Sequence, residues 1–172
     1  MTTSRVYVGT YAKYNNGSLK GEWLKLDDYR DKDEFLAACQ ELHNDEQDPE
    51  LMFQDHEGIP EGLIRESWID DRVWDWIKLD ERKQEIVRAY WEWSTADEEI
   101  ESALEKYRGT YTTLEDYVEE SWEECGDYKR DDKNWWSPIN YVDWKRMARD
   151  LKTSGDIFTV ECDGGIMVFD NY

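Results

Sequence analysis

The chain is poor in the residues that disulfide-stapled and metal-dependent proteins need. Its 172 residues include three cysteines, two histidines and three prolines. Cys39, Cys125 and Cys162 are odd in number, far apart and outside any Cys-x-x-Cys pattern, which indicates reduced, structural thiols. His43 and His56 are not spaced from each other or from a cysteine as metal ligands are. The sequence therefore predicts no metal site, and each histidine is better interpreted as structural.

Long apolar runs and catalytic motifs are also missing. The opening MTTSRVYVGTY has no apolar core of signal-peptide length, and no run approaches the ~18 apolar residues of a membrane span. We therefore expect a cytoplasmic protein. The patterns GxGxxG, GxxxxGK[ST], GxSxG and HExxH do not occur, and GDYKRDDKN lacks the alternation of a calcium loop. These absences predict a protein that is not an enzyme and needs no cofactor.

Basic residues are scarce relative to acidic ones. Lys and Arg number 21 against 42 Asp and Glu, a formal net charge of −21. Residues 1–64 hold 14 acids and 6 bases, residues 65–108 hold 13 and 8, and residues 109–172 hold 15 and 7. The acidity therefore runs along the whole chain, with net charges of −8, −5 and −8. It disfavours nucleic acid or an anionic membrane as a ligand and favours basic proteins.

Aromatic residues, in contrast, are abundant. The chain has 10 Trp, 11 Tyr and 4 Phe, whereas disordered acidic segments are poor in such residues. The sequence thus has the bulk for small cores, while self-repulsion favours an elongated shape. We predict an α+β fold, an elongated chain of three small domains at residues 1–64, 65–108 and 109–172.

The first predicted domain, 1–64, combines antiparallel strands with one helix. Residues 5–26 contain two strands that we expect to turn at Asn16-Gly17, a strong hairpin signal. DKDEFLAACQELHND places apolar residues on one face of a helix begun by Asp31 or Asp33. ELMFQDHE is expected to form a third strand.

The second predicted domain, 65–108, is a small helical bundle. ESWIDDRVWDWIKL and DERKQEIVRAYWEWS place Trp68 and Trp93, among others, at helical spacing. In STADEEIESALEKYRG, Thr95 with Glu98 forms a capping-box pattern and Gly109 is placed to stop the helix.

The third predicted domain, 109–172, is α+β with a C-terminal hairpin. Thr112 with Glu115 reads as the capping box of an acidic helix that Gly126 ends. Ser137-Pro138 is expected to begin a second helix, PINYVDWKRMARDLKTSG. DIFTVECDGGIMVFD reads as a hairpin turning at 163–165.

The acidic helix carries the clearest functional signal. One side of its cylinder is apolar, and the other carries seven carboxylates with no intervening base: Glu115, Asp116, Glu119, Glu120, Glu123, Glu124 and Asp127. Like charges four residues apart cost roughly 0.2–0.5 kcal/mol per pair, and acids in the last turn oppose the helix dipole. Helix stability alone would favour Lys at some of these positions. The pattern therefore indicates a binding surface.

Blander interpretations remain open at this stage. The stripe could be a solvated face, although such faces normally mix signs, or it could reflect adaptation to high salt. A hydrolase with paired carboxylates is a weak alternative, because among 42 acids every spacing occurs by chance. The tryptophans could stack on sugars, but thin cores and a subunit interface explain them better. Trp135 and Trp136 are candidate interface anchors, since Trp is enriched at binding hot spots.

Carboxylates can stand in for phosphates. Duplex DNA carries one negative charge per ~1.7 Å of axis, so a net charge of −21 corresponds to roughly 36 Å of duplex. Helical neighbours at i and i+4 rise about 6 Å, close to the ~6.8 Å of two base steps on one strand. An acidic stripe could thus offer a basic groove something like the field of DNA.

Three segments of the chain follow a known order and spacing: VYVGTYAKYNNGSLKGEWL, YRGTYTTLEDYVEE and INYVDWKRMARDLKTSGD. On these segments the chain resembles the ArdA family of antirestriction proteins. The likeness runs from about Val6 to the last strand and is loosest in the Trp-rich middle. The resemblance implies a dimeric, three-domain DNA mimic, carried by mobile genetic elements, that occupies the DNA-binding channel of type I restriction–modification enzymes.

An alternative function also fits the composition. It is an acidic binding module or chaperone for a basic protein unrelated to restriction.

The last predicted helix is locally basic, with Lys145, Arg146, Arg149 and Lys152. Either the helix dipole or ion pairing, within one subunit or between two, could account for these bases.

Overall fold

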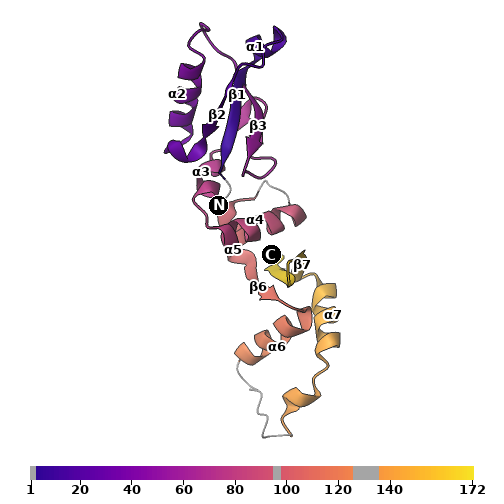
Figure 1. The fold of residues 1–172 in the computed structure, drawn as a ribbon. Coiled ribbons are helices and arrows are strands. Elements are labelled where there is room, and N and C mark those ends of the chain that lie inside the picture. Colours follow the sequence, from indigo (N-terminus) through magenta and orange to yellow (C-terminus); the bar gives the residue numbers. More distant parts are fainter. Residues whose placement is uncertain (1–2, 95–97, 126–135) are drawn as a thin grey trace.

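The chain forms an elongated α+β molecule with its elements strung along one axis (Figure 1). The structure is a computed structural model that describes residues 3–94, 98–125 and 136–172. These residues contain seven α-helices, two short 3-10 helices and three antiparallel sheets. The predicted α+β class is confirmed, whereas the boundaries of the three predicted domains remain a prediction.

The first region is a three-stranded sheet covered by a helix. Its elements are β1 (Arg5–Thr10), α1 (Tyr11–Asn15), β2 (Glu22–Lys25), η1 (Leu26–Asp28), α2 (Lys32–Leu42) and β3 (Leu51–Glu57). β1 lies in the middle of the sheet and pairs antiparallel with β2 and β3. Val6 and Val8 of β1 and Phe35 and Cys39 of α2 are fully buried between the layers.

The hairpin of β1 and β2 is confirmed, but its predicted tight turn is wrong. Thr10 caps α1 by accepting a hydrogen bond from the Lys13 amide, and the chain continues through a loop before β2 begins. Asn16-Gly17 ends this short helix, and Gly17 has a φ of 78°. The same residue pair therefore serves as a helix stop because the strand ends before it reaches the turn.

The middle region mixes two minimal strands with three helices: β4 (Ile64–Arg65), β5 (Trp68–Ile69), α3 (Arg72–Ile77), α4 (Glu81–Trp93) and α5 (Ile100–Lys106). The predicted helical position of Trp68 is wrong, because Trp68 pairs with Arg65 in a two-stranded sheet. The predicted capping box began at Thr95, which lies outside the described residues. In the structure α5 begins later, with Glu99 as its N-cap.

The last region joins a three-stranded sheet to a helical pair: β6 (Tyr107–Tyr111), α6 (Leu114–Glu124), η2 (Pro138–Tyr141), α7 (Trp144–Ser154), β7 (Ile157–Cys162) and β8 (Gly165–Asp170). The sheet order is β6-β8-β7, and the predicted C-terminal hairpin is confirmed, since Cys162 pairs with Gly165. The predicted helix after Ser137 divides into η2 and α7, and Asp143, not Ser137, caps α7.

Gly109 is part of β6 and does not stop a helix, contrary to the prediction. The register of β6 against β8 shifts between Tyr107 and Gly109, and Gly109 has a φ of 146°. A Cβ atom there would lie 2.6 Å from the Tyr111 ring. The glycine is therefore required by this irregular strand and by the ring that covers it.

Buried side chains join all three regions into one hydrophobic cluster. The cluster extends from Val6 and Val8 through Trp76 and Tyr90 to Phe169. Where α4 meets the last sheet, Trp93 stacks on Phe158 with ring centroids 3.8 Å apart and planes 10° apart, and Phe158 stacks on Phe169 at 5.0 Å and 9°. Aromatic stacking thus fastens the middle helices to the C-terminal sheet.

The side chain of Cys39 is fully buried in the first region. Burial raises the pKa of the Cys39 thiol to about 12, which keeps this cysteine protonated and unreactive. Among the helices of the described residues, none combines the length and the apolar character needed to cross a membrane.

Candidate acidic interface

Helix α6 begins with a complete capping box. Thr113 has an extended backbone and accepts a hydrogen bond from the Asp116 amide, while the Asp116 carboxylate accepts one from the Thr113 amide at 2.9 Å. The predicted box of Thr112 and Glu115 is therefore wrong by one residue. The reciprocal bonds satisfy two of the unpaired N–H groups at the helix start.

The apolar side of α6 packs against α7 and β6. Val118 is buried, the Trp122 ring meets Trp144 edge-to-face at 6.3 Å, and the Tyr117 ring meets Tyr111 at 5.2 Å. Figure 1 places α6 and α7 as a helical pair toward the end of the long axis that lies opposite the first region. This packing turns the acidic side of α6 outward.

The predicted carboxylates of α6 form one stripe, as far as the structure describes them. We call this the α6 stripe, and its members are Glu115, Asp116, Glu119, Glu120, Glu123 and Glu124. Asp127, also predicted, lies outside the described residues. Within the described ranges, Glu115, Asp116, Glu120, Glu123 and Glu124 form no ion pair with a Lys or Arg side chain. Their charge is therefore available to a partner.

The field of the stripe reaches a neighbouring phenol. Burial, and then a hydrogen bond to Glu120, raise the pKa of Tyr111 to about 12. The Glu124 carboxylate adds to the effect through its charge. The carboxylates therefore stabilise the neutral phenol, as expected beside an excess of negative charge.

The predicted tryptophan anchors are described only in part. Trp135 lies outside the described residues. Trp136 is 68% exposed and precedes the buried Ser137. A large exposed ring suits an interface, but its role stays a prediction.

The basic residues of α7 do not neutralise the α6 stripe. Arg146 and Arg149 both pair with Asp150 of their own helix, at 3.7 Å and 3.5 Å. Lys145 and Lys152 form no ion pair among the residues that the structure describes. Acids therefore predominate on α6 and bases on α7, whose one acid, Asp150, pairs with two of those bases.

A cluster in the first region resembles a metal site but already holds a cation. His43, Asp45 and Glu46 bring their ligand atoms within 4.8 Å of one another. The Lys13 ammonium lies 2.8 Å from His43 Nδ1, 2.7 Å from Asp45 and 3.0 Å from Glu46. The Nε2 of the buried His43 lies 3.2 Å from the Val8 carbonyl, which assigns the proton to Nε2 and leaves Nδ1 to accept from Lys13. The cluster thus has a structural role.

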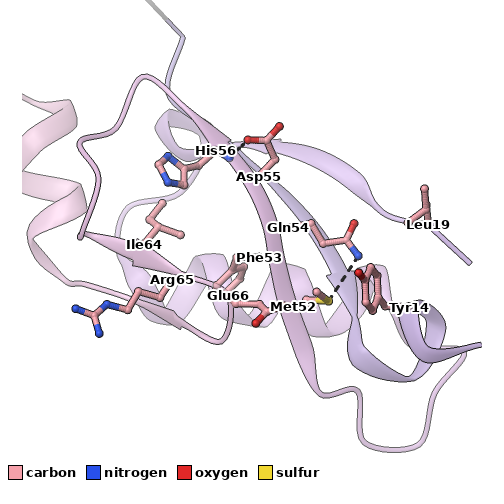
Figure 2. Close-up of a pocket in the computed structure, with 10 residues that line it drawn as sticks. All are labelled: Tyr14, Leu19, Met52, Phe53, Gln54, Asp55, His56, Ile64, Arg65 and Glu66. Atoms are coloured by element: carbon pink, nitrogen blue, oxygen red, sulfur yellow. Dashed lines mark hydrogen bonds between the residues drawn. The ribbon is translucent and has the colours of Figure 1, made fainter. Parts of the chain in front are cut away.

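A hollow of about 610 Å³ runs beside β3 (Figure 2). Met52, Phe53 and Ile64 form its apolar floor. Figure 2 shows Asp55 on β3 and Glu66 on the segment after β4, both among the side chains that line the hollow. The lining is thus a mixture of apolar, polar and charged side chains.

The fold and its surface define a class: an elongated, acidic α+β protein that presents a charged helix to its surroundings. The chain belongs to the family of antirestriction proteins called ArdA, whose sequence pattern matches residues 6–165. A search of curated proteins found no match. Family membership confirms the resemblance noted in the sequence and implies an antirestriction function.

Proposed function

We propose that this protein is a non-enzymatic inhibitor that occupies the DNA-binding channel of type I restriction–modification enzymes. The observation that carries the proposal is the α6 stripe, whose carboxylates face outward on a member of an antirestriction family. Restriction enzymes bind DNA through basic surfaces, and a DNA phosphate chain and an acidic stripe attract such a surface by the same physics.

The spacing of the stripe supports the comparison with DNA. Carboxylates one helical turn apart recur every ~6 Å along α6, near the separation of alternate phosphates on one strand. Binding would release counterions from both surfaces, so affinity should fall steeply with salt, as it does for DNA. The excess of negative charge is spread over the whole chain, so acids outside α6 add to the attraction of a basic surface.

The same hypothesis includes the setting and the assembly of the protein. It acts in the cytoplasm, where it protects incoming DNA of a mobile element. Two copies associate end to end and double the charge to −42, equivalent to roughly 70 Å of duplex axis. The exposed Trp136 is a candidate anchor for that association. Sedimentation equilibrium at several concentrations tests the dimer.

A competition experiment tests the central claim. A labelled duplex bound to a type I methyltransferase core is titrated with wild-type protein, with Glu120→Lys/Glu124→Lys and with the control Glu22→Lys/Glu61→Lys. All four positions are exposed, and both variants have a net charge of −17 instead of −21. We expect the α6 variant to displace DNA at least tenfold less well than the control, with a smaller salt slope.

The competing outcomes are distinct. Wild-type protein that fails to displace the duplex contradicts the proposed function and favours an acidic module for another basic protein. If both variants displace the duplex equally well, the proposed DNA mimicry still holds, but α6 is not its main contact surface. Circular dichroism of each variant checks that the fold is intact.

A further inference from the structure

The basic side of α7 is the largest departure from the charge pattern of this protein. We call Lys145, Arg146, Arg149 and Lys152 the α7 basic face. These side chains line a hollow of about 640 Å³. Leu114 and Ala148 also line it, together with the two acids Glu115 and Asp143. Four bases thus gather around one depression in a chain with twice as many acids as bases.

The helix dipole does not account for these bases. Cations are stabilised near the C-terminal end of a helix and destabilised near its N-terminal end. Lys152 is the one base in the last turn of α7, whereas Lys145 and Arg146 follow directly after Trp144, the first residue. At least half of the face therefore lies at the unfavourable end.

Ion pairing within the chain does not account for them either. Arg146 and Arg149 share one carboxylate, that of Asp150, at distances above 3.4 Å, and all three side chains are more than half exposed. Such exposed pairs contribute about 0–1 kcal/mol. Lys145 and Lys152 form no ion pair with any acid in the described ranges. The face therefore makes little contribution to folding.

We propose that the α7 basic face binds a short acidic segment of the protein that this chain inhibits. This inference rests on the proposed function. Bases that stability does not explain, gathered around a hollow, are complementary to carboxylates. The half-buried Leu114 side chain accepts the methylene groups of glutamate or a neighbouring apolar residue, which a protein segment supplies.

A protein segment fits this hollow better than DNA does. A duplex is a long polyanion and would meet the repulsion of the α6 stripe, of Glu115 and Asp143 at the hollow, and of the net charge of −21. A segment with two or three carboxylates meets the local bases and extends little beyond them. DNA has no positively charged groups of its own, so a protein mimic can make this contact and DNA cannot.

The contact would also orient the inhibitor. The α6 stripe and the α7 basic face lie on neighbouring helices. The stripe attracts positively charged groups, whereas the basic face attracts negatively charged ones. A partner with a basic channel beside an acidic segment therefore attracts the helical pair when α6 faces the channel and α7 faces the segment. It repels the pair in the opposite orientation. The expected partner surface is thus a basic groove with acidic residues close to its edge.

Charge reversal on α7 should weaken binding to the methyltransferase core, whereas the same reversal elsewhere should not. Lys145→Glu/Arg149→Glu/Lys152→Glu is compared with the control Lys25→Glu/Arg65→Glu/Lys83→Glu, and each reversal changes the net charge by −2, from −21 to −27 in total. In the competition assay with the methyltransferase core, we expect the α7 variant to bind about tenfold more weakly than wild-type protein. The control should bind equally well or more tightly, because it is more acidic.

An α7 variant that binds as tightly as wild-type protein, or more tightly, overturns the proposal. A parallel loss of self-association in sedimentation by the α7 variant also overturns it, in favour of a second copy of the chain as the occupant. The control triple must remain folded by circular dichroism, and the neutral variant Lys145→Gln/Arg149→Gln/Lys152→Gln should show an intermediate loss.

A second experiment separates this proposal from the proposed function. The Ala148 methyl resonance of the intact protein is followed by NMR during titration with a Glu-rich hexapeptide, its Gln counterpart and a 20-base-pair duplex. Saturable shifts with the Glu peptide alone, lost in the α7 triple variant, support the proposal even if wild-type protein fails to displace DNA from the methyltransferase. The absence of such shifts, or the same shifts with the duplex, overturns it.

Discussion

The first and last regions have the same net charge and arrange it in opposite ways. Residues 1–64 and 109–172 each have a net charge of −8. In the first region, bases reach across elements to acids: Lys13 holds Asp45 and Glu46, and Arg5 pairs with Glu57 at 2.8 Å. In the last region, Arg108 of β6 also pairs with Asp170 of β8, but the acids of the helical pair lie mainly on α6 and its bases on α7. The arrangement of charge, more than its sum, therefore distinguishes the ion-paired surface of the first region from the proposed binding surface of α6.

The energetic consequence follows from the pairing. An acid that accepts hydrogen bonds from a neighbouring base contributes to stability, whereas unpaired like charges four residues apart cost roughly 0.2–0.5 kcal/mol per pair. On α6 this cost applies to the like-charged neighbours Asp116 and Glu120, and to Glu120 and Glu124. Loss of charge should therefore destabilise the first region and leave α6 as stable as before.

Removal of Lys13 should have the largest effect on stability. The Lys13 side chain is 13% exposed and interacts with His43, Asp45 and Glu46. Lys13→Met leaves these groups without their cation, and we expect the free energy of unfolding in urea to fall by about 2 kcal/mol. The matched change on the other side of the comparison, Glu123→Gln, should leave it unchanged or slightly higher. An equal loss in both variants would contradict the contrast.

Acid should weaken the first region through the same cluster. A hydrogen bond from Thr10, and then one from Lys13, lower the pKa of Glu46, and a hydrogen bond from Lys13 lowers that of Asp45. Because these pKa values are lower in the folded state, the stabilisation is complete above the ordinary carboxyl pKa of about 4 and is lost as the pH falls through the folded values. Urea unfolding between pH 6 and pH 3 should therefore show a smaller loss for Lys13→Met than for wild-type protein. Parallel curves would show that the cluster is not responsible.

Removal of the α6 cap should have a smaller effect on stability than removal of Lys13. Thr113→Ala removes the hydroxyl that accepts from the Asp116 amide, and we expect a loss of about 1 kcal/mol in the free energy of unfolding. Thr112→Ala is the control, because the structure places the cap one residue later. If the control loses more stability, the capping box begins at Thr112, as first predicted from the sequence.

Helices with a regular apolar face could be predicted from the sequence. The periodicity of α2, α4 and α6 identified each helix, because the burial of one face follows directly from the spacing of apolar residues. The acidic surface of α6 could be predicted for the same reason. The C-terminal hairpin was also identified, since Asp163-Gly164 forms a two-residue turn between paired strands.

Features that depend on distant partners could not be predicted in this way. β6 is a strand because it pairs with β8, more than fifty residues later, and its glycine looks like a helix stop when read locally. Asn16-Gly17 suits a tight hairpin and a helix end alike, and the length of β1 decides between them. The contact of Lys13 with the His43 cluster likewise joins residues about thirty positions apart.

The aromatic stack of Trp93, Phe158 and Phe169 bears on the stiffness of the molecule. Duplex DNA has a persistence length of about 50 nm, so it is stiff over the length of a protein. A channel that binds DNA therefore contacts charges that are held on a nearly straight rod. A body hinged between its middle helices and its last sheet would let those charges swing and lose their spacing. The Trp93 ring, stacked at 3.8 Å on Phe158 across that junction, and the Phe158 ring, stacked in turn on Phe169 within the sheet, oppose such bending. This stiffness is what the proposed mimicry of a duplex requires.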